Sequence, residues 1–222
     1  MKKEELAGMF DHTLLKPYAT DQEFEKFCNE AKEMKVKMDA INSVPVKLCK
    51  KLLKGSPIHV GAAISFPFGQ TTIEMKIAET KQAIKDGADE IDYVINISKV
   101  KMHDWDYIEQ EMKSIVDVCN QNNVISKVIF ENCYLTKDEI KKLAEIAKKI
   151  KPNYIKTSTG FGTYGTLVED VALMKSVVGD KVQVKAAGGI RDYQTCLKMI
   201  EAGATRIGTS HSKVILDGYE KV

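Results

Sequence analysis

The sequence predicts an α/β protein with a closed (β/α)8 TIM barrel formed as a single domain over residues 1–222. Short apolar segments alternate with amphipathic helical segments along the whole chain, which is typical of a parallel sheet. Eight such units without a linker favour a closed barrel, because an open doubly wound sheet would need only about five or six strands. The first strand is not followed by a GxGxxG motif, so a dinucleotide-binding fold is disfavoured.

The first half of the chain supplies four predicted strands, at 9–13, 36–44, 58–66 and 89–97. Capping boxes at 20–23 and 71–74 indicate two helix starts, since each pairs a threonine with a glutamate three residues later. Pro45 opens the helix after the second strand, and Gly87 ends the helix before the fourth. Strands and helices therefore alternate from the start.

The second half continues this pattern, with predicted strands at 125–130, 153–158, 181–187 and 204–209. A helix is expected at 106–121, where apolar residues recur at helical spacing. Further capping boxes are expected at 136–139 and 166–169, and Asp192 and Gly203 bound the last predicted helix.

Composition excludes several classes of partner. The net charge of +2 and the pI of about 8.1 favour neither nucleic acid nor a membrane surface. The five cysteines are scattered and have no zinc-site spacing, so we expect a reduced cytoplasmic protein without metal or cofactor. The N-terminus lacks the apolar region of a signal peptide, and no apolar run approaches the ~20 residues of a membrane span.

Two lysines stand out because each ends an apolar strand and is followed by glycines. These are Lys156 in NYIKTSTG and Lys185 in VQVKAAGG. Burial of an ammonium group costs several kcal/mol unless it is compensated. Schiff-base formation requires such a lysine, because a desolvated amine with a lowered pKa can attack a carbonyl. Either lysine alone could be a strand-end residue that reaches solvent, but the pair favours catalysis.

Asp92 lies in the middle of a predicted strand, on the same face as Glu90 and Val94. A buried carboxylate needs a partner, and Lys156 and Lys185 are expected at the same end of the barrel, where such enzymes place their active sites. Repulsion between the two ammonium groups would lower the pKa of one of them, and Asp92 could move protons directly or through a water. A purely structural ion pair is the alternative for Asp92.

Other polar residues are expected at the same strand ends, namely Asp11, Asn42 and Glu131. A phosphate site is also expected, since loops after the seventh and eighth strands of such barrels often bind phosphate through backbone N–H groups. The candidates are Gly188, Gly189, Arg191, Gly208 and Ser210, with the segment from Gly160 to Gly162 completing an anion cradle. A plain tight turn is the alternative for the glycine pair.

Six motifs carry these residues in order along the chain: DHTLLKP at 11–17, GADEIDYVIN at 87–96, KVIFENCYLT at 127–136, KTSTGFG at 156–162, VKAAGGIR at 184–191 and AGATRIGTS at 202–210. Together they resemble the deoxyribose-phosphate aldolase family, metal-independent class I aldolases on a (β/α)8 barrel. The resemblance implies reversible cleavage of 2-deoxy-D-ribose 5-phosphate to acetaldehyde and D-glyceraldehyde 3-phosphate. It also implies a role in the cytoplasmic catabolism of deoxyribose phosphates.

The resemblance assigns a role to each candidate. Lys156 matches the imine-forming lysine, Lys185 the lysine that perturbs its pKa, and Asp92 the proton-transfer group. Asp11 and Thr13 match supporting polar residues. Phosphate is implied near Gly160, Gly188, Gly189 and the turn from Gly208 to Ser210. The expected partners are small molecules, a sugar phosphate and acetaldehyde, and a homodimer or higher homo-oligomer is compatible with the sequence.

Several positions depart from the family pattern. Asn42 stands where many members carry a cysteine, so we expect better resistance to inactivation by aldehyde. His211 and Ser212 stand in a segment that is often SSG, and Ser65 replaces a glycine. Tyr219 matches a C-terminal tyrosine that can reach the active site, although a disordered tail is the simpler expectation.

Three alternatives remain open from the sequence. The first is another Schiff-base barrel aldolase, which would normally lack the second strand lysine. The second is a phosphate-binding isomerase, which would form no imine. The third is a non-catalytic barrel that senses a sugar phosphate, although a sensor would gain nothing from Lys156, Lys185 and Asp92 together.

Overall fold

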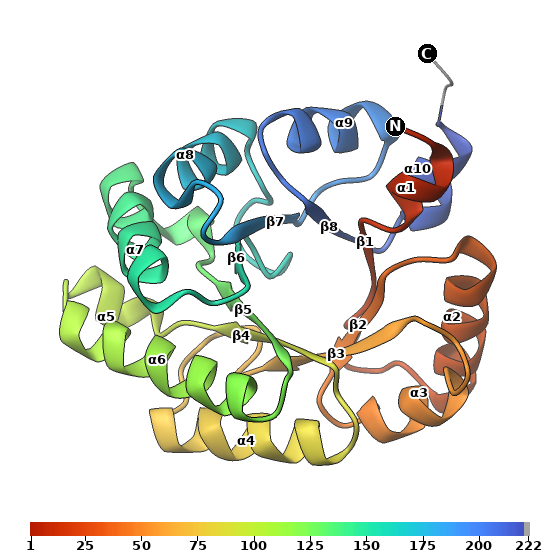
Figure 1. Cartoon of the computed structure of the whole chain (residues 1–222), viewed down its shortest axis with the longest axis horizontal. Helices are drawn as coiled ribbons and strands as arrows, with labels where there is room; N and C mark the ends of the chain where they lie inside the picture. The colour runs from red at the N-terminus through yellow and green to blue at the C-terminus, as the bar shows by residue number, and fades with distance from the viewer. Residues whose placement is uncertain (220–222) are drawn as a thin grey trace.

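The computed structural model describes residues 1–219, and these residues form a closed barrel of parallel strands. The strands follow one another around the barrel in sequence order, and β1 and β8 pair to close it. The helices form a ring outside the strands, as the view along the barrel shows (Figure 1). The predicted (β/α)8 barrel is therefore confirmed.

All eight predicted strands are present, and their ends lie within three residues of the expected positions. They are β1 (Phe10–Leu14), β2 (Met38–Asn42), β3 (His59–Ile64), β4 (Glu90–Val94), β5 (Ile125–Ile129), β6 (Tyr154–Lys156), β7 (Gln183–Ala187) and β8 (Arg206–Thr209).

The helices include four short ones that the sequence analysis missed, α1, α5, the 3-10 helix η1 and α10. The helices are α1 (Lys3–Ala7), α2 (Asp21–Met34), α3 (Val46–Leu52), α4 (Ile73–Lys85), α5 (Ile97–Lys101), α6 (Trp105–Gln121), η1 (Asn132–Tyr134), α7 (Lys137–Ile150), α8 (Val168–Val178), α9 (Tyr193–Glu201) and α10 (Ser212–Asp217). Within residues 1–219, none of them combines the length and the apolar character needed to cross a membrane.

Two of the predicted capping boxes, at 20–23 and 136–139, are formed. The box predicted at 71–74 is not formed, and the cap of α4 lies one residue later than expected. Thr72 caps α4 by accepting a hydrogen bond from the Met75 N–H, whereas the Thr71 hydroxyl lies 2.7 Å from that of Ser65. Thr71 is therefore paired with Ser65, and Thr72 is the residue that caps the helix.

The capping box predicted at 166–169 is wrong. Helix α8 begins after Leu167, which has no capping side chain. The Thr166 N–H instead donates to the Gly188 carbonyl oxygen at 2.9 Å, across to the loop that follows β7. A tertiary hydrogen bond thus positions this segment for a neighbouring loop and overrides the local capping signal.

The hydrophobic core lies between the strands and the ring of helices. Strand β4 illustrates this, because Ile91 and Tyr93 belong to the apolar core cluster while Glu90 and Asp92 point into the barrel. This confirms the predicted alternation of the strand. Each fully buried large apolar side chain contributes about 1.5–3 kcal/mol, so the outer layer supplies much of the stability. Because the apolar core lies outside the strands, the interior of the barrel can hold charged side chains.

The first and last helices meet on one side of the barrel, where α1 lies beside α10 (Figure 1). The Tyr219 hydroxyl donates to the Met1 carbonyl oxygen at 2.6 Å, and its ring packs edge-on against Tyr193. The expectation of a disordered tail is therefore wrong for Tyr219, which is held by the N-terminus and α9. The rest of that tail, residues 220–222, lies outside the described residues.

Candidate active site

Lys156 and Lys185 lie opposite each other on the paired strands β6 and β7. Both are almost completely buried, at 4% and 1% exposure. Asp92 reaches them from β4, and its Oδ2 lies 2.9 Å from the Lys156 Nζ and 2.6 Å from the Lys185 Nζ. The structure therefore brings together the three residues that the sequence analysis singled out.

A further lysine and a further carboxylate lie below this group. Lys127 on β5 donates to Asp92 Oδ1 at 2.6 Å and contacts the Glu90 carboxylate. The Lys185 Nζ also lies 2.5 Å from Asp11 Oδ2, which comes from β1. Asp11, predicted as a supporting residue, thus acts on Lys185 from β1.

Arg206 on β8 connects the two lower carboxylates. Its Nε donates to Asp11 Oδ1 at 2.7 Å, and its Nη2 donates to Glu90 Oε2 at 2.9 Å. His59, at the start of β3, places Nδ1 2.7 Å from Glu90 Oε1. We call the seven charged side chains inside the barrel the interior charge cluster: Asp11, Glu90, Asp92, Lys127, Lys156, Lys185 and Arg206.

The sequence analysis did not include Lys127 and Arg206, although both carried the signal that identified Lys156 and Lys185. Each is a cation within an apolar strand, in ISKVIF and ATRIGT. All three carboxylates of the interior charge cluster come from β1 and β4, and all four cations come from β5 to β8. The contacts between these carboxylates and cations depend on how the strands pair in the closed barrel, which the sequence alone does not give.

The pKa of Lys156 is lowered to about 8. Burial is the largest cause, the attraction of Asp92 opposes it, and the repulsion of Lys185 adds to it. Desolvation and repulsion between the lysines were both expected from the sequence, and desolvation is the larger contribution. About one tenth of Lys156 is therefore a free amine at pH 7, far more than for an ordinary lysine.

Asp92 and Lys127 of the interior charge cluster are held in their charged forms. Burial alone would raise the pKa of Asp92, but Lys127, Lys156 and Lys185 together hold it well below its ordinary value. Burial likewise opposes the charge of Lys127, yet the attraction of Asp92, Glu90 and Asp11 raises its pKa above the ordinary range. Lys156 therefore loses its proton more readily than the neighbouring Lys127.

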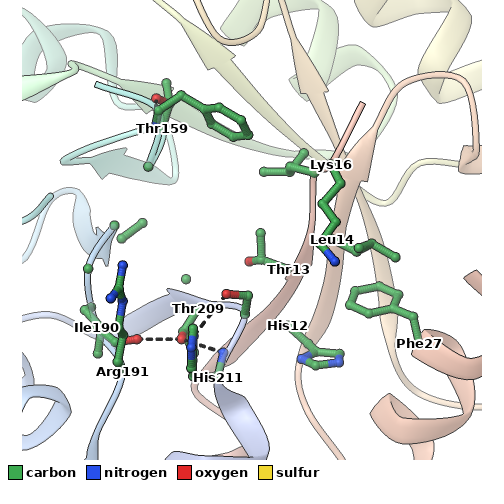
Figure 2. Close-up of a pocket in the computed structure, with 18 of the residues that line it drawn as sticks. His12, Thr13, Leu14, Lys16, Phe27, Thr159, Ile190, Arg191, Thr209 and His211 are labelled. Atoms are coloured by element: carbon green, nitrogen blue, oxygen red, sulfur yellow. Dashed lines mark hydrogen bonds between the residues drawn. The ribbon is translucent and has the colours of Figure 1, made fainter. Parts of the chain in front are cut away.

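A pocket of about 510 Å³ opens above Lys156. Thr13, Leu14 and Lys16, from β1 and the loop after it, lie on one side of this pocket, and Arg191, Thr209 and His211 lie on the other (Figure 2). The predicted phosphate residues Gly160, Gly188, Gly189, Gly208 and Ser210 all line it.

The loop after β7 has a backbone shape that requires glycine. Gly188 and Gly189 have φ values of +88° and +78°, in the left-handed region that other residues rarely adopt. Gly165 packs directly against this loop, and a Cβ atom there would clash with the Gly188 carbonyl. Gly162, expected in the anion cradle, lies instead against Cys133 and Glu131. Gly162 therefore does not line the pocket with the other candidates.

The loops after β7 and β8 are tied together by Thr209. Its hydroxyl donates to the Ile190 carbonyl oxygen at 2.7 Å and accepts from the His211 N–H at 2.9 Å, and both bonds are visible in Figure 2. Arg191 and Lys16 add cationic side chains at the pocket walls. Backbone N–H groups and cations together make this region suited to an anion.

The remaining sequence candidates lie around the site. Glu131 accepts from the Thr159 N–H at 3.1 Å, which fixes the loop after β6, and burial raises its pKa. Asn42 donates to the Leu15 carbonyl oxygen at 3.4 Å. Ser65 has a φ of +50°, in the left-handed region that favours glycine, and its N–H donates to Glu79 at 2.9 Å.

Ser212, unlike His211, does not line the pocket, and it forms a hydrogen bond with His12. Its Oγ lies 3.0 Å from the His12 Nδ1. His12 stacks on Phe27 of α2, so this contact links β1, α2 and α10. Within residues 1–219, no group of three or more His, Cys, Asp or Glu side chains is arranged to hold a metal ion.

Comparison with known proteins gives a consistent result. Residues 6–212 match the family model described as DeoC/LacD family aldolase. The deoxyribose-phosphate aldolase of Lactobacillus acidophilus is 60% identical over 93% of this chain and 87% of its own length. That of Bacteroides thetaiotaomicron is 50% identical over 99% of this chain and 92% of its own. The deoxyribose phosphate aldolase structure from Aeropyrum pernix, described as tetrameric, has a TM-score of 0.90 at 28% identity, covering 97% and 91% of the two chains.

Proposed function

Because the chain belongs to the DeoC/LacD family of aldolases, we propose that it reversibly cleaves 2-deoxy-D-ribose 5-phosphate to acetaldehyde and D-glyceraldehyde 3-phosphate. The observation that carries this proposal is the contact of Lys156 and Lys185 with one oxygen of Asp92. Lys156 lies at the base of a pocket whose rim is rich in glycine and cations, and Asp92 and Lys185 lie directly behind it. Such a pocket suits an aldehyde at one end and a phosphate at the other.

The reaction begins with the neutral amine of Lys156, which adds to the C1 aldehyde of the open-chain sugar phosphate. Loss of water gives a protonated imine that withdraws electrons from C2. The C2–C3 bond then breaks as the C3 hydroxyl loses its proton. C3 becomes the aldehyde of D-glyceraldehyde 3-phosphate, and the bonding electron pair moves to C2 as an enamine. Protonation of C2 and hydrolysis of the imine release acetaldehyde and restore the amine.

Asp92 and Lys185 are the proton carriers that we propose for these steps. Both lie within hydrogen-bond reach of the Lys156 Nζ or of each other, which general acid–base catalysis requires. Asp11 holds Lys185 from below, at 2.5 Å, and so supports its orientation. Thr13 lines the pocket, and its hydroxyl is anchored to the Asp11 carbonyl oxygen at 2.9 Å.

The phosphate end is proposed to lie between the loops after β6, β7 and β8. Gly160, Gly188, Gly189, Gly208 and Ser210 line this part of the pocket. Hydrogen bonds connect these loops to one another, so their N–H groups are preorganised for an anion.

The cellular setting is also part of the proposal. All five cysteines are free thiols, which fits a reducing compartment such as the cytoplasm. There the reaction would serve the breakdown of deoxyribose phosphates. The A. pernix structure is described as tetrameric, and we propose that this chain also forms a homo-oligomer. Light scattering of the purified protein would measure its oligomeric state.

Imine trapping tests the central claim. The protein is incubated with 2-deoxyribose 5-phosphate or acetaldehyde and reduced with borohydride, and the added mass is located by peptide mapping. We expect a stable adduct on Lys156 that is lost in Lys156→Ala. Lys181→Ala is the matched control, because Lys181 is an exposed lysine just before β7. A folded protein that binds the sugar phosphate without forming an adduct would contradict the aldolase mechanism and favour an isomerase or a sensor.

A further inference from the structure

The interior charge cluster contains one cation more than it has anions. Lys127, Lys156, Lys185 and Arg206 carry up to four positive charges, and Asp11, Glu90 and Asp92 carry three negative charges. All seven side chains are buried, with exposures of 4% or less. A low-dielectric interior disfavours an unbalanced charge. Loss of one proton from the cluster would make it neutral.

The contacts show which cation is the surplus one. Lys127 contacts Asp92 and Glu90, Lys185 contacts Asp92 and Asp11, and Arg206 contacts Asp11 and Glu90. Each of these three cations therefore bridges two carboxylates. Lys156 reaches only Asp92 Oδ2, an oxygen that it shares with Lys185.

Glu90 does not contact Lys156, but it contacts two of the other cations and so affects how the negative charge is shared. Its Oε2 lies 2.9 Å from the Arg206 Nη2 and also contacts the Lys127 Nζ. Its Oε1 is engaged by His59 at 2.7 Å and by Arg206 at 3.1 Å. Without the Glu90 charge, Lys127 and Arg206 would depend on Asp92 and Asp11 alone, and less negative charge would remain for Lys156.

We propose that Glu90, Lys127 and Arg206 are positioning residues that set the charge balance of the barrel interior and thereby make Lys156 the amine that loses its proton. The assignment of the imine to Lys156 rests on the proposed function, whereas the charge balance itself does not. None of the three residues lines the pocket, so they act through Asp92, Asp11 and Lys185.

The electrostatic surroundings of Lys156 agree with this role. The charged groups that face it are Asp92 from β4, Lys127 from β5, Glu131 after β5, and Lys185 from β7. The pKa of Lys156 is lowered whereas that of Lys127 is raised, although both lysines are buried. The difference follows from the number of carboxylates that each lysine contacts.

The test measures the pKa of Lys156 without any substrate. Trace labelling with acetic anhydride, which reacts with neutral amines, is followed across neutral and alkaline pH, and the Lys156 peptide is quantified by mass spectrometry. Glu90→Gln removes one anion, so the pKa of Lys156 should fall by about one unit or more. Lys127→Met removes one cation, so the pKa of Lys156 should rise by about the same amount.

The double variant Glu90→Gln with Lys127→Met restores the balance, and its Lys156 pKa should return toward that of the unmodified protein. Lys113→Met and Asp117→Asn are matched controls, because these residues form an exposed ion pair on α6. They should leave the Lys156 pKa unchanged. If Glu90→Gln does not fold, Lys127→Met and Arg206→Gln test the same balance, since each removes one cation and each should raise the pKa.

Shifts of the same sign in Glu90→Gln and Lys127→Met, or no shift in either folded variant, would overturn the proposal. A merely structural role would not give shifts of opposite sign that cancel in the double variant. Imine trapping is run in parallel on the unmodified protein. Absence of an adduct there would refute the proposed function and leave the labelling result valid, so the two failures can be distinguished.

Discussion

The Lys156 Nζ lies 2.9 Å from Asp92 Oδ2, and the same oxygen accepts a hydrogen bond from Lys185 at 2.6 Å. One carboxylate oxygen thus serves two amines. When Lys156 gives up its proton, Asp92 keeps Lys185 as its partner and remains charged. The arrangement therefore allows Lys156 to change its protonation state without leaving a buried carboxylate unpaired.

Imine formation should increase with pH and level off above about pH 8. Only the neutral amine attacks an aldehyde, and burial lowers the pKa of Lys156 from 10.5 to about 8. Below this pKa the amine is protonated and unreactive, and above it the neutral form predominates. The measurement is the initial rate of acetaldehyde adduct formation, trapped with cyanoborohydride at a series of pH values. A midpoint near the ordinary lysine value would contradict the lowered pKa.

Asp92→Asn should lower kcat by about 10²–10⁴-fold, because an amide cannot accept and return a proton. The same change leaves Lys127 and Lys185 with fewer anions, so we also expect a loss of about 3–5 kcal/mol in the free energy of unfolding. Coupled assay of D-glyceraldehyde 3-phosphate gives kcat, and urea unfolding gives the stability. A kcat within a few-fold of the unmodified enzyme would remove Asp92 from the proposed proton transfer.

Gly165→Ala should weaken use of the phosphorylated substrate while sparing the imine site. A Cβ at this position clashes with the Gly188 carbonyl, so the loop after β7 must move. A displacement of about 1 Å can cost about 100-fold in kcat/KM for 2-deoxyribose 5-phosphate. Trapping of acetaldehyde on Lys156 should be little changed. Gly8→Ala is the control, since a Cβ there meets only ordinary contacts at 3.5 Å. Equal losses with both substrates would indicate general misfolding.

Asp39→Asn should stabilise the protein at neutral pH. Burial, followed by the neighbouring Cys28, raises the pKa of Asp39 to about 9. The folded state therefore holds a proton at pH 7 that the unfolded state releases, and stability falls as pH rises from about 4 to 9. Asparagine removes this loss, worth about 2–4 kcal/mol at pH 7, and the gain should vanish near pH 4.

Urea unfolding at both pH values measures the Asp39→Asn effect. Asp180→Asn is the control, because the Asp180 side chain is fully exposed to solvent. A gain in stability that is the same at acidic and neutral pH would show that Asp39 is not held protonated.

The sequence predicted the barrel because its strands and amphipathic helices recur in a regular order. Strand alternation also placed Asp92 inside the barrel, and the unusual polarity of Lys156 and Lys185 identified them in apolar segments. These features are local, so they can be recognised one segment at a time.

Features that depend on several segments were not predictable in this way. Lys127 and Arg206 carry the same local signal as Lys156 and Lys185, but their pairing with Glu90 and Asp92 follows only from the register of the closed barrel. The failed cap at Thr166 has the same origin, since its N–H is used by Gly188 on another loop. The short helices α1, α5 and α10 span too few residues for a helical period to be detected.

The separation of charge between the strands has a consequence for assembly of the chain from fragments. Inside the barrel, β1 to β4 contribute only acids to the interior charge cluster and β5 to β8 contribute only bases. Two copies of either half would therefore bury like charges, whereas one copy of each half would be nearly neutral. If the chain is divided in the turn at 122–124, the two separately produced fragments should recombine with each other and not with themselves. The charges that shape the reaction site would thus also specify which half-barrel is the correct partner.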